Sequence, residues 1–145
     1  MMLAIGCDHG GFELKNHIMK HLEERGTAFK DFGCYDENSC DYPDIAKTVC
    51  EAVSGGKCEN GILICGTGIG MSIAANKVNG IRAALCTDVY SAKMTKQHNN
   101  SNVICLGGRV TGRELAFMIV DTWLDETFLG GRHQNRIDKI SELER

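Results

Sequence analysis

The chain has 145 residues, of which 43% are hydrophobic and 24% charged, enough for about one domain with its own hydrophobic core. Its formal net charge of −3 argues against a general nucleic-acid binder, because such proteins carry a basic face. Its apolar runs are far shorter than the ~20 residues of a membrane span, and its N-terminus lacks the features of a signal peptide. We therefore expect a cytoplasmic protein with no membrane or nucleic-acid partner.

Strand and helix patterns alternate along the chain. Apolar runs predict five strands, at 3–7, 28–32, 62–64, 81–86 and 103–106. Helical spacing or capping signals predict a helix after each strand and one more at the end: 12–25 stopped by Gly26, a helix from Pro43 to Gly55, one after Gly70, 89–97, one opened by a capping box of Thr111 and Glu114, and 132–144 after Gly130.

This alternation predicts an α/β fold of three layers (α/β/α), doubly wound and Rossmann-like, with a five-stranded parallel sheet and a C-terminal helix in a single domain over 1–145. Ligands of such folds bind beyond the carboxyl ends of the strands. Four pairs or runs of polar residues fall at those ends, and we expect them to converge: Asp8–His9, Cys65–Thr67, Thr87–Asp88 and Gly108–Arg109.

Eight cysteines could suggest a secreted disulfide scaffold, but their placement argues against it. Four of them lie in or at the end of apolar strand-like runs, and no C-x-x-C pair occurs: Cys7, Cys65, Cys86 and Cys105. We predict that most are small buried side chains in a reducing compartment.

The central stretch, 61–77, reads G-I-L-I-C-G-T-G-I-G-M-S-I-A-A-N-K. A buried strand that enters a glycine-rich turn and then a helix presents free backbone N–H groups at the positive end of that helix, which predicts an anion site. The same dipole favours the thiolate form of Cys65, so we predict chemistry rather than packing for this side chain.

Other glycine-rich loops fit this stretch poorly. A Walker A loop needs Lys and then Ser or Thr after its last glycine, where this chain has Met71 and Ser72. The glycines at 66, 68 and 70 give G-x-G-x-G in mid-chain, not the dinucleotide fingerprint. A cysteine-dependent phosphatase loop would place an arginine at Met71.

Several polar residues have both a structural and a functional interpretation. Thr67 can cap a helix or offer its hydroxyl to a substrate. His98 stands at a helix end, where the dipole favours an imidazolium. His17 and His21 have a spacing that zinc sites use, but without a third ligand a solvated face is favoured.

For the last helix, the position of its positive charges favours a functional over a structural interpretation. Arg132 and Arg136 lie one turn apart near its N-terminus, where cations oppose the dipole. A phosphate clamp explains the pair better than solubility does.

Five motifs in order make the chain similar to the family of type B ribose-5-phosphate isomerases, which also holds galactose-6-phosphate isomerase subunits. The motifs are G-C-D-H-G-G at the start, D-Y-P-D at 41–44, C-G-T-G-I-G with A-A-N-K at the centre, H-N-N-S-N with L-G-G-R at 98–109, and the late R-x-x-x-R. The resemblance covers essentially the whole chain.

The resemblance implies an aldose–ketose isomerase of ribose 5-phosphate and ribulose 5-phosphate, without metal or cofactor. It implies three catalytic residues: Cys65 as the base between C1 and C2, Thr67 assisting proton transfer to the oxygens, and His98 opening the furanose. Substrate-binding roles follow for Asp8 near the ring, the backbone of Gly66, Gly68, Ile69 and Gly70, the phosphate ligands His9, Arg109, Arg132 and Arg136, and the pocket residues Tyr42 and Asn99. One branch of the family uses a glutamate where this chain has Met71, so Cys65 is the base if the assignment holds.

The resemblance further implies a homodimer, with higher assembly open, whose sites take His98 and the late arginines from the partner. Asp8 is expected either to orient His98 or to accept a sugar hydroxyl. Three alternatives stay open from the sequence: a six-carbon substrate such as allose 6-phosphate or galactose 6-phosphate, a non-catalytic sugar-phosphate-binding protein, and a flavodoxin-like nucleotide module. The combination of Cys65, Thr67 and His98 argues against the binding protein, because binding alone needs no base.

Overall fold

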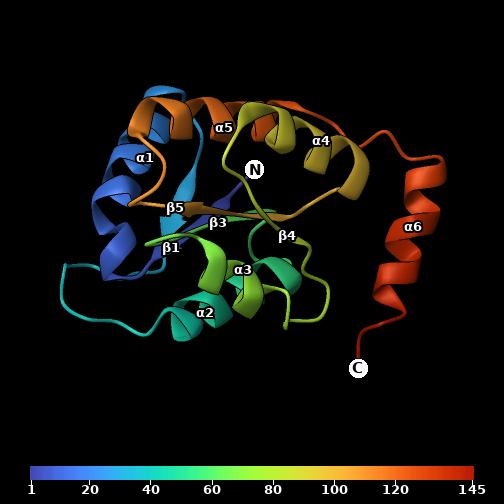
Figure 1. Ribbon diagram of the computed structural model, residues 1–145, viewed down its shortest axis with the longest axis horizontal. Coiled ribbons are helices and arrows are strands. Elements are labelled where there is room, and N and C mark those ends of the chain that lie inside the picture. The colour runs from blue at the N-terminus through green and yellow to red at the C-terminus, as the bar shows by residue number, and fades with distance from the viewer.

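The computed structural model describes residues 1–145, which form a five-stranded parallel sheet between two layers of helices (Figure 1). The strands are β1 (Leu3–Cys7), β2 (Phe29–Asp31), β3 (Asn60–Cys65), β4 (Ala83–Leu85) and β5 (Val103–Gly107), in the spatial order β2-β1-β3-β5-β4. The helices are the 3₁₀ turn η1 (His9–Gly11), α1 (Phe12–Glu24), α2 (Tyr42–Ser54), α3 (Ile69–Ala75), α4 (Val89–Asn99), α5 (Arg113–Asp125) and α6 (Arg132–Ser141). The predicted fold class is confirmed.

Alternating side chains of the strands bury two separate apolar clusters, one on each face of the sheet. Ile62 and Ile64 of β3 face α1, α4 and α5, where Trp123 is fully buried and its indole N–H donates to Ser101 Oγ at 2.9 Å. Leu63 and Cys65 of the same strand face α2 and α3. The side chain of Cys65 therefore lies on the α2–α3 face, at the carboxyl end of its strand.

Two predicted strands are shorter than the sequence suggested. The patterns at 28–32 and 81–86 contain only three strand residues each, in β2 and β4. Both strands are at the edges of the sheet, where one side of each has no partner to extend the ladder.

The predicted capping box at the start of α5 is wrong. The helix begins one residue later than that pattern requires, with Gly112 as its N-cap and no side-chain capping bond. Thr111 is buried beside the turn that follows β5, and the Glu114 carboxylate lies 3.3 Å from Arg113 Nε. Tertiary packing of Thr111 overrides the local signal.

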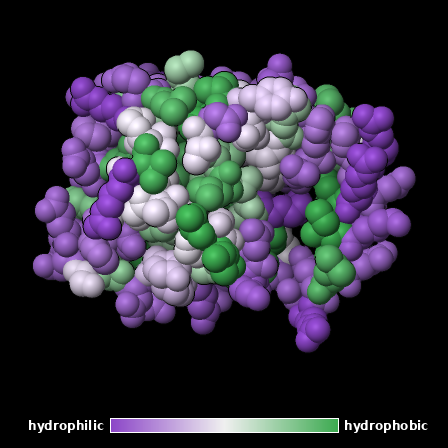
Figure 2. All heavy atoms as spheres, viewed as in Figure 1, coloured by the Kyte–Doolittle hydropathy of each residue, from purple (hydrophilic) through white to green (hydrophobic).

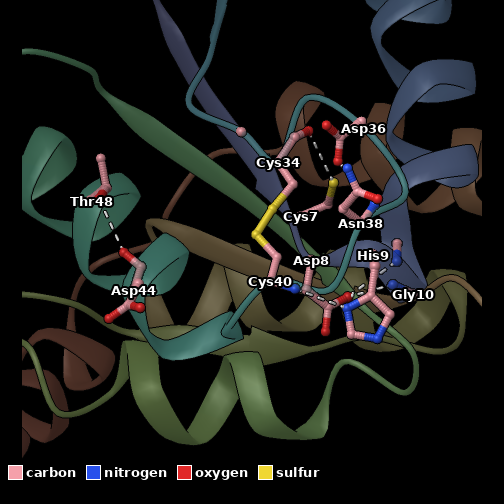
Figure 3. The surroundings of a disulfide bond; sticks show 12 residues. Cys7, Asp8, His9, Gly10, Cys34, Asp36, Asn38, Cys40, Asp44 and Thr48 are labelled. Atoms are coloured by element: carbon pink, nitrogen blue, oxygen red, sulfur yellow. Dashed lines mark hydrogen bonds between the residues drawn. A yellow bond between two sulfur atoms is a disulfide. The ribbon is translucent and has the colours of Figure 1, made fainter.

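Six of the eight cysteines are free and buried, as predicted for most of them. The remaining two, Cys34 and Cys40, form a disulfide across the loop between β2 and α2 (Figure 3), which the sequence analysis did not predict. No helix is both long and apolar enough to cross a membrane.

Strand order places the site. The chain winds from β1 to β2 in one direction and then returns to β3 on the other side of β1, so β1 and β3 flank the switch point of the sheet. A crevice forms beyond the carboxyl ends of the strands at such a point. The turns after β1 and β3 meet here, and a Cβ on Gly11 would lie 2.5 Å from the carbonyl oxygen of Ile64.

We expect Gly11→Ala to lower the free energy of unfolding by about 1–3 kcal/mol, because the new methyl group meets backbone that cannot rotate away. Urea unfolding followed by circular dichroism measures the change as a lower midpoint at unchanged slope. Asn16→Ala, an exposed position on α1, is the matched control and should stay within about 0.5 kcal/mol of the original protein. Equal stability of both variants would contradict the close approach.

Candidate active site

Three loops meet at the carboxyl ends of β1, β3 and β5. The Asp8 N–H donates to the Ile64 carbonyl at 3.1 Å, which joins the first loop to β3. The Gly108 N–H donates to the Cys65 carbonyl at 2.8 Å, and the Arg109 N–H donates to the Gly66 carbonyl at 3.0 Å. Three of the four predicted groups of polar residues therefore converge.

The fourth group, Thr87–Asp88, makes no hydrogen bond to these loops. Asp88 caps α4 instead: its carboxylate accepts hydrogen bonds from the backbone N–H and hydroxyl of Ser91. These bonds lower the pKa of the Asp88 carboxyl group. Asp88 therefore caps the start of α4, and the convergence of Thr87–Asp88 with the other groups stays a prediction.

Cys65 ends β3 with its sulfur turned back over the glycine loop. The side chain is 5% exposed, and its Sγ accepts a hydrogen bond from the Gly68 N–H at 3.1 Å. Gly68 has φ of 80°, a left-handed conformation that glycine adopts without strain, and it is the N-cap of α3. The start of α3 therefore directs a backbone N–H group at the Cys65 sulfur.

The loop after Cys65 also has backbone donors that no acceptor in the chain uses. The N–H groups of Gly66, Thr67 and Gly70 donate no hydrogen bond within the chain. They lie where the chain turns from β3 into α3, next to the sulfur of Cys65. Free N–H groups in a preformed loop are suited to stabilise an oxyanion.

Thr67, Ile69 and Tyr42 border this loop. Thr67 is exposed, and its Oγ1 accepts from the Ile69 N–H at 3.3 Å, so it caps the turn loosely while Gly68 is the N-cap. Tyr42, the first residue of α2, packs against Gly70, where an added Cβ would lie 2.6 Å from the tyrosine ring. The structure thus places all three predicted site residues around the loop.

Asp8 and His9 approach from β1. Asp8 is 8% exposed, and its Oδ1 accepts from the Gly10 and Gly11 N–H groups at 2.9 and 3.2 Å (Figure 3). Its Oδ2 accepts no hydrogen bond within the chain, so this oxygen is free to accept one from a ligand. His9 is exposed, and its Nδ1 accepts from the Cys40 N–H at 3.3 Å.

A cavity of about 490 Å³ opens beside these loops, and His9 and Arg109 both line it. The Arg109 side chain also lies against Gly66, where an added Cβ would be 3.3 Å from its Nη1. The cavity contains only one hydrophobic residue, so charged and polar groups dominate its wall. Such a wall suits a charged ligand such as a phosphate.

The other predicted site residues gather elsewhere. His98, near the end of α4, stacks on His133 of α6 with the ring centroids 4.2 Å apart. Desolvation together with the charges of His98, Arg132 and Arg136 lowers the pKa of His133. We call these four residues the basic cluster. The sequence analysis did not predict His133 as a member of this cluster, although the R-H-x-x-R spacing places it next to Arg132.

Asn99 lies next to this cluster, at the last residue of α4. It lines a cavity of about 900 Å³ between the body of the protein and α6. Figure 2 shows this region as a hollow, with apolar side chains of α6 along its far side. The segment after α6 contacts the body of the protein through the Gly80 N–H, which donates to the Glu144 carboxylate at 2.8 Å.

Chain direction explains this separation. A helix that links two parallel strands must run back along the sheet, so α4 starts near the carboxyl ends of the strands and ends near their amino ends. In Figure 1 the carboxyl ends of the strands are at the left, whereas α6 and the end of α4 are at the right. The predicted site residues therefore fall into two groups at opposite ends of the sheet: Cys65 with its loops, and the basic cluster with Asn99.

The two histidines on α1 each contact a different acidic side chain. His17 Nε2 lies 3.8 Å from the Glu13 carboxylate. The His21 Nε2–H donates to the Asp121 carboxylate at 2.8 Å, and the His21 ring stacks on Phe117. No group of three or more potential metal ligands occurs in the structure. Each histidine has its own partner.

The model of the ribose/galactose isomerase family matches residues 3–140. The chain belongs to this family. It is 53% identical over 142 residues to ribose-5-phosphate isomerase B of Escherichia coli, which covers 98% of this chain and 95% of the relative. The resemblance predicted from the five motifs is confirmed.

Solved structures of family members superpose closely on the chain. Ribose-5-phosphate isomerase B of Clostridium thermocellum matches with a TM-score of 0.97 and 54% identity, over 99% of this chain and 97% of the other. The enzyme from Mycoplasma genitalium, solved with bound ribulose 5-phosphate, matches with a TM-score of 0.93 and 43% identity, over 97% and 94%. Both confirm the predicted fold.

We expect thiol reagents to label Cys65 first among the six free cysteines. Burial raises the pKa of Cys7 and Cys86 to about 11 and that of Cys50 to about 12, so these thiols stay protonated near neutral pH. Brief treatment of the folded protein with iodoacetamide at about pH 8, followed by peptide mass spectrometry, measures the order. Faster labelling of Cys50 than of Cys65 would contradict the assignment.

Proposed function

We propose that this protein interconverts ribose 5-phosphate and ribulose 5-phosphate, with Cys65 as the base that moves a proton between C1 and C2. Membership of the ribose/galactose isomerase family makes it an aldose–ketose isomerase, and ribulose 5-phosphate is the ligand of one solved relative. The observation that carries the proposal is the meeting of the Cys65 sulfur with unused N–H donors in one loop.

The proposed reaction needs a base and a site for negative charge. The Cys65 thiolate takes the proton from C2 of the open-chain aldose. The negative charge moves to the carbonyl oxygen on C1, which gives the enediolate. A proton then moves between the two oxygens with the help of the exposed Thr67 hydroxyl. Return of the proton from Cys65 to C1 gives the ketose, so the base is regenerated.

The loop after Cys65 supplies hydrogen-bond donors for the negative charge that develops on the enediolate oxygens. The N–H groups of Gly66, Thr67 and Gly70 have no acceptor in the free chain, so they need not break other bonds when the enediolate forms. Donors fixed in this way lower the barrier more than mobile water does. Met71 is fully buried in the core between α2 and α3, which leaves Cys65 as the base of the loop.

Phosphate binding is assigned to His9 and Arg109 in this chain. Both line the polar cavity beside the loop, one from the turn after β1 and one from the turn after β5. A sugar phosphate is a dianion near neutral pH, and Arg109 offers it a two-pronged donor. Asp8 holds the turn with Oδ1 and offers Oδ2 to a sugar hydroxyl.

We further propose that two chains form a dimer in which each basic cluster completes the site of the other chain. His98 and Arg132 belong to a cluster that lies at the end of the sheet opposite to Cys65. A two-fold axis is the simplest operation that brings unlike ends of two identical chains together twice. In this arrangement His98 opens the sugar ring and the arginines hold the phosphate.

Exposed apolar residues support the same assembly. Ile69 and Ile73 of α3 are 51% and 60% exposed, and Leu85 at the end of β4 is 37% exposed. Figure 2 shows apolar side chains gathered over α3 and the neighbouring part of the sheet, beside the hollow that α6 borders. A patch of this kind next to an open hollow is typical of a surface that another chain covers.

We expect Cys65→Ala to lower kcat for ribose 5-phosphate by about 10²–10⁴, because the reaction loses its base while the backbone donors stay. Ketose formation by the purified enzyme measures the rate, and allose 6-phosphate serves as the six-carbon comparison. Cys58→Ala removes another buried thiol, outside the site, and should leave kcat unchanged. Activity of Cys65→Ala close to that of Cys58→Ala would exclude Cys65 as the base.

Mixing two inactive variants tests the shared site. Cys65→Ala and His98→Asn each damage a different half, and a hybrid dimer contains one intact site, so equal mixing should restore about a quarter of the original activity. Subunit exchange is verified by native mass spectrometry. Exchange without recovered activity would show that each chain acts alone.

A further inference from the structure

A loop closed by a disulfide connects the buried sheet to His9, which lines the polar cavity described above (Figure 3). The loop covers residues 34–40, between β2 and α2, and the disulfide links its two ends, Cys34 and Cys40. Both cysteines are half-buried, and every residue between them is exposed. A small dithiol reductant can therefore reach the sulfur atoms.

The Cys34 end is fixed to the core. Its N–H donates to the Cys7 carbonyl at 2.7 Å, and its own carbonyl accepts from the Lys15 ammonium. Lys15 is fully buried and pairs with the Asp31 carboxylate at 2.8 Å. A buried charge that is paired and hydrogen-bonded holds its partners in one arrangement, so Cys34 moves with the sheet.

The Cys40 end contacts the site. The Cys40 N–H donates to His9 Nδ1 at 3.3 Å, and this is the one hydrogen bond that Cys40 makes. Because Nδ1 accepts, the neutral imidazole carries its proton on Nε2. That N–H is then directed away from the loop and is free to donate to a phosphate oxygen.

We propose that the Cys34–Cys40 disulfide positions His9 for binding of the phosphate group, and that reduction of the disulfide weakens sugar-phosphate binding while proton transfer at Cys65 continues. The inference rests on the proposed function, in which His9 is a phosphate ligand. A dithiol such as dithiothreitol supplies two electrons and two protons: the S–S bond breaks, two thiols form, and the reductant becomes a disulfide. Cys34 stays with the core, and Cys40 loses its covalent link to it.

Reduction is expected to affect substrate binding and not proton transfer, because the loop that carries Cys65 is held independently of residues 34–40. The loop that carries Cys65 is fixed by the turns after β1 and β5 through backbone hydrogen bonds to Ile64, Cys65 and Gly66, and residues 34–40 take no part in them. His9 is exposed and has a single hydrogen bond to fix its ring, the one from Cys40. Release of Cys40 frees the imidazole and leaves the base in place.

The test compares the oxidised enzyme with the same enzyme after reduction by dithiothreitol. Thiol titration in denaturant should rise from six to eight free thiols, which verifies the reduction. We expect KM for ribose 5-phosphate and the inhibition constant of inorganic phosphate to rise about three- to tenfold, as for the loss of one well-oriented hydrogen bond to a charged group, while kcat changes less than about twofold. Unchanged KM after verified reduction would overturn the proposal.

Variants separate this effect from other actions of the reductant. The double variant Cys34→Ala/Cys40→Ala should have the KM of the reduced enzyme and should not respond to dithiothreitol, whereas Cys58→Ser should respond like the original protein. In a His9→Ala background, reduction should leave KM unchanged; a persisting increase would show that the loop acts through another group. Reduction of the unaltered protein needs no substitution, so it decides the question even if a variant misfolds.

The two proposals fail in different ways. An oxidised enzyme without isomerase activity contradicts the proposed function, and calorimetric titration with inorganic phosphate still tests the loop. Active enzyme with the same phosphate affinity in both redox states contradicts the inference alone.

Discussion

The three loops of the site can meet because glycine stands where one backbone crosses another. Gly11 lies over the Ile64 carbonyl, and added Cβ atoms on Gly107 and Gly108 would come within 2.7 Å of the Thr67 and Gly10 carbonyl oxygens. Contacts between backbones leave no side chain to yield, so they fix the relative position of the loops more firmly than side-chain packing does. The position of Cys65 relative to Asp8 and Arg109 follows from these crossings.

A loop fixed in this way keeps its N–H groups pointed at open space. Gly68 adopts its left-handed conformation and donates to the Cys65 sulfur, and the neighbouring donors stay without acceptors in the chain. These residues are exposed or partly exposed, so water can reach their N–H groups in the free chain. In the proposed mechanism the enediolate replaces that water, and the donors are already oriented for it.

The topology that brings Cys65 and its loops together also separates them from the basic cluster. Helices of a parallel sheet return to the amino ends of the strands, so the residues at the end of α4 cannot reach the glycine loops of their own chain. His98 and its neighbours therefore gather around α6, and the hollow between α6 and the body remains open. In the proposed dimer, the basic cluster of each chain lies beside Cys65 and the glycine loop of the other chain.

The sequence by itself determined the order of strands and helices, because buried strands and amphipathic helices leave clear periodic patterns, and it located Cys65 and the glycine loop by their position between them. It also indicated His9, Arg109 and the late arginines as candidates. Local patterns could not decide every contact: Thr111 is buried where a capping box was predicted, because tertiary packing overrides the local capping signal. Only the tertiary structure added His133 to His98 and the late arginines, and linked Cys40 to both Cys34 and His9. These pairings depend on the winding of the chain around the sheet, which brings together residues whose separation in the sequence carries no periodic signal.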